Sequence, residues 1–262
     1  MILQNIKCFF RLIIAEKKGL ANYIGKSIMQ VIIPVVVVYF LLKFISFQAQ
    51  EKVNYYKYIF ISLLYINYTL SFPGRIVDWL KTEKQRGTLE TISMSRIGVP
   101  GILTYTFVVY MLIFTIVEMP IYIFIALKFL SLDLSRCISL DFLVFLVFNI
   151  ILSYGLTFIS ASILFFCDVS LFSSNFLRVY NFLSGAYFSI NILPLFVRIF
   201  SYILPFTYGL ILLRKLVLSD KAISLMDFVP FVSFVLVVLS VGFLFLEKMV
   251  LFKRKNSSLR DY

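Results

Sequence analysis

Residues 83–90 read EKQRGTLE, a charged and glycine-containing segment in a chain that is otherwise rich in Phe, Ile, Leu and Val. Long apolar runs flank it, Tyr55–Val77 before it and Val99–Leu127 after it. A helix that crosses a membrane needs roughly 20 mostly apolar residues, so each flanking run predicts a span. The octapeptide between them therefore predicts a loop at the membrane surface.

The composition of the whole chain supports this prediction. Of 262 residues, 61% are hydrophobic and 15% are charged, whereas a soluble domain has about 45–50% apolar and about 25% charged residues. The apolar surplus is more than a water-soluble core can bury. We therefore predict an all-α integral membrane protein whose residues 1–262 form a single transmembrane domain.

Six transmembrane helices are predicted from the apolar runs. The segment 194–218 is also apolar, but Pro194, Pro205 and Gly209 interrupt it, and we predict a re-entrant helical hairpin on the outer side before the sixth span. Pro73-Gly74 is predicted to end the second span. The six spans are Ser27–Phe47, Tyr55–Val77, Val99–Leu127, Phe142–Phe166, Leu171–Leu193 and Phe228–Val250.

Lysine and arginine residues predict the orientation. Most of them lie in the N-terminal arm (1–26), in the loop segment 78–98 and its edges, and around the C-terminal tail (251–262). The positive-inside rule therefore places both termini and the octapeptide in the cytoplasm. In the arm, Lys7, Arg11 and Lys18 share one helical face, which predicts an amphipathic helix at the interface with membrane lipids.

Several classes of function are disfavoured. The net charge of +12 comes from residues beside the apolar runs, which indicates contact with anionic lipids and not with nucleic acid. The chain has no histidine, and its three cysteines have no metal-type spacing. The stretch GLANYIGKS (19–27) has five residues between its glycines where a phosphate loop needs four, so we predict no ATP site in this chain.

The octapeptide itself has two interpretations. On a continuous helix, Glu83, Gly87 and Glu90 would lie on one face, with a glycine between two carboxylates. Charged runs usually form solvated faces, which favours a simple connector helix. The alternative is a docking element, in which the glycine permits close approach of a basic partner.

The run Glu83-Lys84-x-x-Gly87-Thr88-Leu89-Glu90 resembles the E-[KR]-x-x-G-T-L-E hallmark of type 2 ABC transporter permeases. In that family the motif lies in the cytoplasmic loop between the second and third of six spans, which is its place here. The layout of arm, spans and broken outer hairpin is also similar. With this resemblance the docking interpretation is favoured over the connector.

The resemblance implies that the chain is the permease subunit of an ATP-driven exporter in the cell membrane. Two copies, identical or related, would form the translocation pathway. Separate ABC ATPase subunits would bind ATP and Mg, and this chain would hold no cofactor. The residues that would couple to the ATPase through a cytoplasmic helix are Glu83, Lys84, Gly87, Thr88, Leu89 and Glu90.

Two sets of polar residues within predicted spans are candidates for the translocation path. Glu118 lies in the third span, where a carboxylate requires a polar partner or a water-filled path. Two roles therefore stay open for it, a contact between helices and a position on the translocation path. In the fifth span a polar stripe either lines the path or joins helices through hydrogen bonds. The residues of this stripe are Asn181, Ser184, Phe188 and Asn191.

Two other classes of function remain as alternatives. A membrane-embedded enzyme acting on lipid needs convergent catalytic groups, and no carboxylate pair in one span or serine motif is present. A stand-alone secondary transporter is typically built from inverted repeats with broken helices in both halves, and only one broken region is visible. The sequence identifies neither the substrate nor whether the two permease copies are identical.

Overall fold

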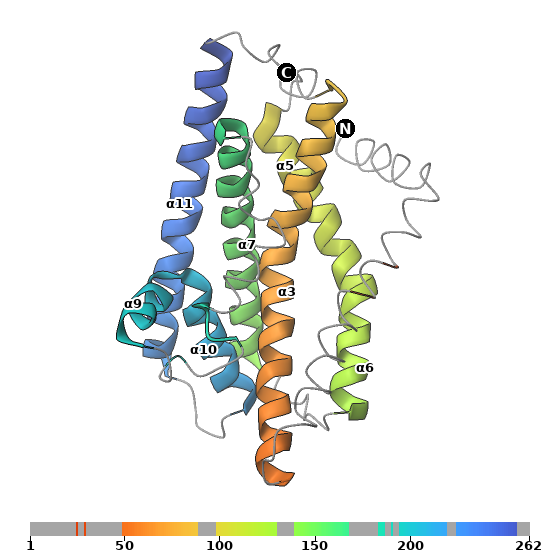
Figure 1. Ribbon diagram of the computed structural model, residues 1–262, viewed down its shortest axis with the longest axis vertical. Coiled ribbons are helices and arrows are strands. Elements are labelled where there is room, and N and C mark those ends of the chain that lie inside the picture. Colours follow the sequence, from red (N-terminus) through yellow and green to blue (C-terminus); the bar gives the residue numbers. More distant parts are fainter. Residues whose placement is uncertain are drawn as a thin grey trace. The chain divides into compact units, whose positions relative to one another are not determined.

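The computed structural model of the chain describes residues 25, 29, 49–88, 98–129, 139–167, 183–186, 190, 194–218 and 224–255. Within these ranges the regular elements are helices, without a strand (Figure 1). This agrees with the predicted all-α class. The N-terminal arm and the first span lie outside the described residues except for Gly25 and Met29, and so does most of the fifth span.

The chain divides into two compact units. One comprises Met1–Lys57 and Val108–Leu132, and the other comprises Tyr58–Phe107 and Asp133–Tyr262. Helices α3 (Ala49–Gln85) and α5 (Gly98–Ile113) each contribute residues to both units. The octapeptide begins in the second unit, at the end of α3.

Three helical stretches among the described residues are long and apolar enough to cross a membrane: Gly98–Lys128, Leu140–Leu164 and Leu225–Met249. They correspond to the predicted third, fourth and sixth spans. The first combines α5, the π-helix η1 (Phe114–Glu118) and α6 (Met119–Phe129). The others lie in α7 (Leu140–Cys167) and α11 (Leu225–Lys255). The chain is thus a multi-pass membrane protein, while the total of six spans stays a prediction.

The predicted second span lies in α3, which does not meet the same requirement for apolarity. Its tyrosines, Asn67, Thr69 and Arg75 lower the average hydropathy, and much of the helix is buried within protein. The prediction that Pro73-Gly74 ends this helix is wrong, because α3, 37 residues long, continues past Pro73 to Gln85. Proline removes one backbone hydrogen bond, and packing against neighbouring helices can offset that loss.

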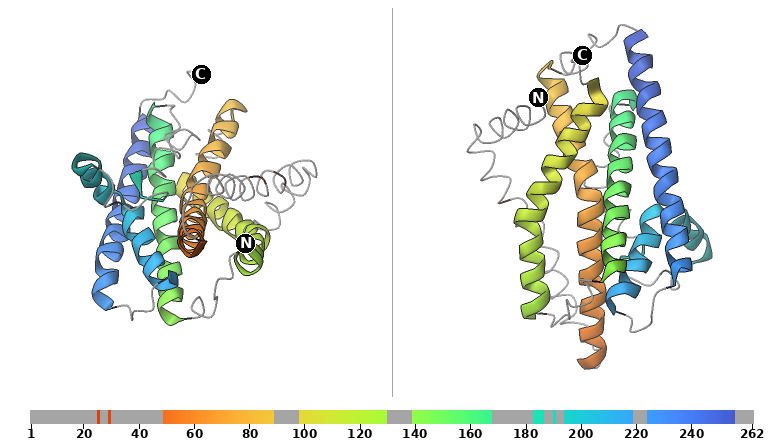
Figure 2. Two further views of the ribbon diagram at one scale, coloured as in Figure 1. Left: turned by 60° about the horizontal axis from the view of Figure 1, so that its bottom comes forward. Right: turned by 180° about the vertical axis from the view of Figure 1, so that it is seen from behind.

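Helices α7 and α11 lie side by side along most of their lengths (Figures 1 and 2). Glycines make their closest approach possible. A Cβ atom on Gly242 would lie 2.6 Å from the carbonyl oxygen of Gly155, and one on Gly155 would lie 3.0 Å from the backbone of Leu239. Small residues at such crossings let two helix backbones approach closely, which is how membrane helices gain packing energy.

The predicted interruption of segment 194–218 is confirmed. Helix α9 (Leu195–Ile203) and helix α10 (Pro205–Leu218) meet at an 88° bend. At the bend Leu204 is extended, and the Thr207 hydroxyl donates a 2.6 Å hydrogen bond to the carbonyl oxygen of Ser201. The pair is either a broken span or a re-entrant hairpin. In Figure 1, α10 lies beside the N-terminal half of α11.

Helix α11 is longer than the apolar stretch that it contains, which ends at Met249. It extends to Lys255, so the first residues of the predicted tail 251–262 continue the last helix. The apolar residues of this stretch, with long Lys and Arg side chains that favour helices, explain the extension.

Candidate functional site

The first residues of the octapeptide, 83–85, form the C-terminal end of helix α3. The amide of Gly87 donates to the carbonyl oxygen of Lys84 at 3.1 Å, and the amide of Thr88 donates to that of Glu83 at 3.1 Å. These two bonds define a Schellman motif, which satisfies carbonyl groups that the end of a helix leaves without partners. The first part of EKQRGTLE is therefore a helix stop.

Gly87 has a φ angle of +71°, in the left-handed region. Residues with a Cβ atom adopt this region at a cost, so glycine is the usual residue at this position of the motif. A Cβ atom on Gly87 would meet nothing within 4 Å. Within the described part of the chain the glycine is needed for its backbone conformation and not for space.

The prediction of one continuous helix through the octapeptide is therefore wrong. The chain leaves the helix after Gln85, so Glu83 and Gly87 do not share a helical face as their spacing suggested. The cause is local, because the Schellman bonds stabilise a left-handed glycine in place of a further helical turn. Leu89 and Glu90 lie outside the described residues.

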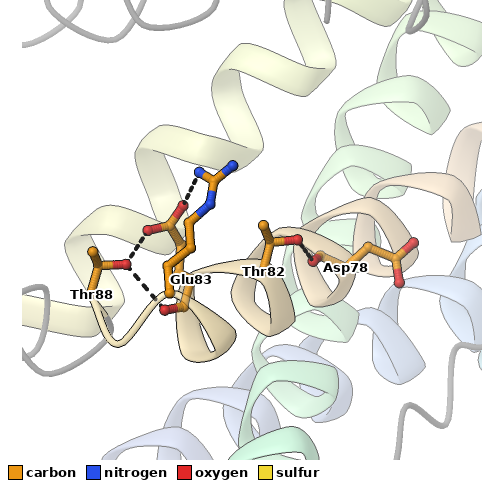
Figure 3. A network of polar contacts seen from close by, with 5 residues as sticks. Asp78, Thr82, Glu83 and Thr88 are labelled. Carbon is orange, nitrogen blue, oxygen red and sulfur yellow. Dashed lines mark hydrogen bonds and ion pairs between the residues drawn. The ribbon is translucent and has the colours of Figure 1, made fainter.

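The Glu83 carboxylate turns back on its own helix end (Figure 3). One of its oxygens lies 2.5 Å from the Thr88 hydroxyl, and the other lies 3.6 Å from a guanidinium nitrogen of Arg86. The Glu83 side chain is 16% exposed, whereas that of Arg86 is 58% exposed. Glu83 thus stabilises the turn, while Arg86 presents positive charge to the surroundings.

The surface of this turn is polar and accessible. Gln85, Arg86, Gly87 and Thr88 are all exposed, and Lys84 is partly exposed. One turn earlier in the helix, the Thr82 hydroxyl donates to the carbonyl oxygen of Asp78 at 2.9 Å (Figure 3). The helix end is therefore ordered by its own hydrogen bonds and leaves an accessible polar edge.

Glu118 ends the π-helix in the third span and is 2% exposed. Phe114 and Tyr122 lie four residues before and after it and are also buried, so the three share an inward face. A π-helix is rare and frequently lies at a functional site. The burial of Glu118 places it among protein groups in this conformation, and its role in transport stays a prediction.

Of the predicted polar stripe, the structure describes Ser184, which is buried. The stripe was predicted on one face of a continuous helix, and this is wrong at residues 184–186, which form a turn. Gly185 has a φ angle of +75° there, which interrupts the helical periodicity. The other three residues, Asn181, Phe188 and Asn191, lie outside the described residues.

A set of buried hydrogen bonds between α3 and α7 was not predicted from the sequence. The Thr69 hydroxyl lies 3.0 Å from the Asn149 side-chain oxygen, and the Ser153 hydroxyl donates to the Thr69 carbonyl oxygen at 3.1 Å. The small polar residues of both runs were the available signal, because such residues commonly join membrane helices. Arg214, which lies in an apolar run, was also not identified as a site residue from the sequence.

Among the residues that the structure describes, no group of three Cys, Asp or Glu side chains is placed to hold a metal ion. Two comparisons with known proteins bear on function. A family model described as "ABC-2 type transporter" matches residues 15–218. A search among curated proteins returned no match.

Proposed function

Because the chain belongs to the ABC-2 type transporter family, we propose that it is the membrane-spanning permease subunit of an ATP-driven exporter. The family match is the observation that carries this proposal, since it includes the octapeptide and α3 to α10. In this proposal the chain itself catalyses no reaction. ATP and Mg are bound by separate ABC ATPase subunits.

The proposed contact with the ATPase is the end of α3. Its exposed residues, Gln85–Thr88, and the Schellman bonds that order them support this assignment. A preordered turn loses little conformational entropy when it binds a partner. Lys84, Leu89 and Glu90 complete the proposed contact, with Glu90 as the acidic group that faces a basic partner surface.

Glu83 receives a different role from the one that its spacing suggested. Its carboxylate is engaged by Thr88 and Arg86, so we assign it to the shape of the turn. Arg86, whose side chain is 58% exposed, is then proposed to contribute positive charge to the contact. The docking surface is thus proposed to include both charge signs.

The rest of the proposal concerns assembly and location. Two permease copies form the pathway, with Glu118, Asn181, Ser184, Phe188 and Asn191 as candidate path residues. The protein lies in the cell membrane with both termini in the cytoplasm. In the second unit, the Gln85 end of α3 and the Lys255 end of α11 lie at the same end, which supports this orientation (Figure 1).

The proposal is tested by purification of the full-length chain from its native membrane in mild detergent. We expect a subunit with a phosphate loop to co-purify in an amount similar to that of the chain. Glu90→Lys should lose this subunit, because like charges at an interface cost several kcal/mol. Asp141→Lys, an equal charge reversal at an exposed position outside the octapeptide, should retain it. Absence of such a subunit from the wild-type preparation would refute the proposal.

A further inference from the structure

Arg214 lies on α10 within the apolar run GLILLRKLVL. An ionised side chain in such a segment is expensive unless protein groups surround it, so it usually marks a functional position. Its neighbour Lys215 is exposed and forms a 2.7 Å ion pair with Asp227 on α11. Arg214 points elsewhere, toward α3 and the turn at 184–186.

The guanidinium group of Arg214 contacts two segments that lie far apart in the sequence. Its Nε and Nη2 atoms lie 3.2 Å and 2.5 Å from the Ser62 hydroxyl oxygen on α3. Nη2 also lies 2.9 Å from the carbonyl oxygen of Gly185 and 3.1 Å from that of Ala186. Arg214 therefore joins α10 both to α3 and to the turn at 184–186.

The surroundings of this group are built for arginine. The guanidinium carbon lies 3.5 Å from the centroid of the Tyr58 ring, a cation–π contact on the same face of α3. Ser62 donates its own proton to the Tyr58 carbonyl oxygen at 2.6 Å, so the hydroxyl oxygen is available as an acceptor. A lysine would provide neither the planar group for stacking nor the forked donors.

A second contact fixes α10 against α3. The Tyr65 hydroxyl lies so close to Gly209 that a Cβ atom at that position would overlap it. Tyr65 and Ser62 lie about one helical turn apart on α3, and Gly209 and Arg214 lie on α10. Two contacts, one steric and one charged, therefore set the position of α10 along α3.

These contacts lie far from the octapeptide on the same helix. Ser62 and Gln85 belong to α3, and the rise of an α-helix places them roughly 35 Å apart. We propose that Arg214 is a positioning residue that fixes the α9–α10 hairpin to α3, so that displacement of the octapeptide by the ATPase reaches the hairpin. The transmission of ATP-driven motion rests on the proposed function, whereas the attachment of α10 to α3 does not.

The attachment is tested first, by labelling of a cysteine with N-ethylmaleimide. The probe is Ala186→Cys in the full-length protein after serine replaces Cys8, Cys137 and Cys167, because Ala186 is fully buried beside Arg214. In proteins that also carry Arg214→Lys or Arg214→Gln, the cysteine probe should react about tenfold faster or more, as expected from the loss of charged hydrogen bonds. Lys215→Gln, which breaks the neighbouring ion pair, should keep the original rate. Ser62→Ala removes a single acceptor and should give a smaller acceleration.

Transmission is tested in the complex with the co-purified ATPase subunit. A non-hydrolysable ATP analogue should change the labelling rate of Ala186→Cys, and Arg214→Lys should abolish this change while ATPase binding and ATP hydrolysis persist. Unaltered labelling in both Arg214→Lys and Ser62→Ala would overturn the attachment. An analogue-dependent change that survives in Arg214→Lys would overturn its role in transmission. If no ATPase subunit co-purifies, the proposed function is refuted. The attachment of α10 to α3 is then still decided by the labelling rates of the purified protein in detergent.

Discussion

At Gly87 the backbone of α3 turns out of the helix with a φ angle of +71° and two amides that bond back to Glu83 and Lys84. Glycine at this position could have two purposes: a left-handed backbone or room for a partner. The open space around Gly87 among the described residues favours the left-handed backbone. The two purposes differ in which substitutions they tolerate.

The substitutions Gly87→Val and Gly87→Asn distinguish the two purposes, because valine and asparagine have side chains of similar size. Asparagine visits the left-handed region readily, whereas a β-branched residue there is a genuine outlier. We expect Gly87→Val to lose about 1–2 kcal/mol of local stability at the helix end, the cost of a left-handed residue with a Cβ atom. Hydrogen exchange of the amides at 85–88 should accelerate in Gly87→Val and change little in Gly87→Asn.

The reverse result is also informative. Equal exchange in the two variants would contradict the assigned role of the left-handed conformation. If both variants lose the ATPase subunit while exchange remains normal in Gly87→Asn, the glycine also provides space for the partner. Neither substitution should disturb the packing of the spans, because the turn is exposed.

At the scale of elements, the α7–α11 pair depends on Gly155 and Gly242. Gly242→Leu would push a side chain into the α7 backbone, and overpacking of this kind costs about 1–3 kcal/mol. Ser240→Leu is the matched control, since Ser240 is exposed on the same helix. Heating followed by size-exclusion chromatography should show a smaller folded fraction for Gly242→Leu alone, and equal losses in both variants would contradict the packing account.

The sequence predicted most of the described helices because a membrane imposes length and apolarity on each span. Three predicted spans follow from that constraint, and the bend between α9 and α10 follows from the prolines and glycine that interrupt the apolar segment 194–218. The length of α3 did not follow, because the effect of Pro73 depends on the neighbours that pack around it.

The site was predicted less completely than the helices. The position of the octapeptide between spans was evident, but its helix stop required the left-handed conformation of Gly87, which spacing alone does not specify. A basic last turn followed by glycine is a typical signal for a helix C-terminus and was present in KQRG. The contacts of Arg214 with residues 62, 185 and 186 join distant parts of the chain, and no local pattern indicates them.

At the scale of the whole molecule, the proposed topology places the octapeptide and the tail in the cytoplasm. Single cysteines at residues 84–86 and in the tail should react only after the membrane is permeabilised. Cysteines near Lys52, Arg136 and Lys221 should react in intact cells. The prediction follows from the distribution of Lys and Arg, and a tail that reacts in intact cells would contradict the six-span arrangement.

The proposed contact between the α3 end and an ABC ATPase subunit is tested most directly by site-specific photo-crosslinking in the native membrane. A photoreactive phenylalanine analogue replaces Gln85, which is exposed in the octapeptide, and in a separate variant it replaces Met226, which is 79% exposed at the start of α11. We expect the residue-85 probe to crosslink to the subunit that carries the phosphate loop, and the residue-226 probe to give no such product. No crosslink to that subunit from residue 85, or an equally strong one from residue 226, would contradict the account.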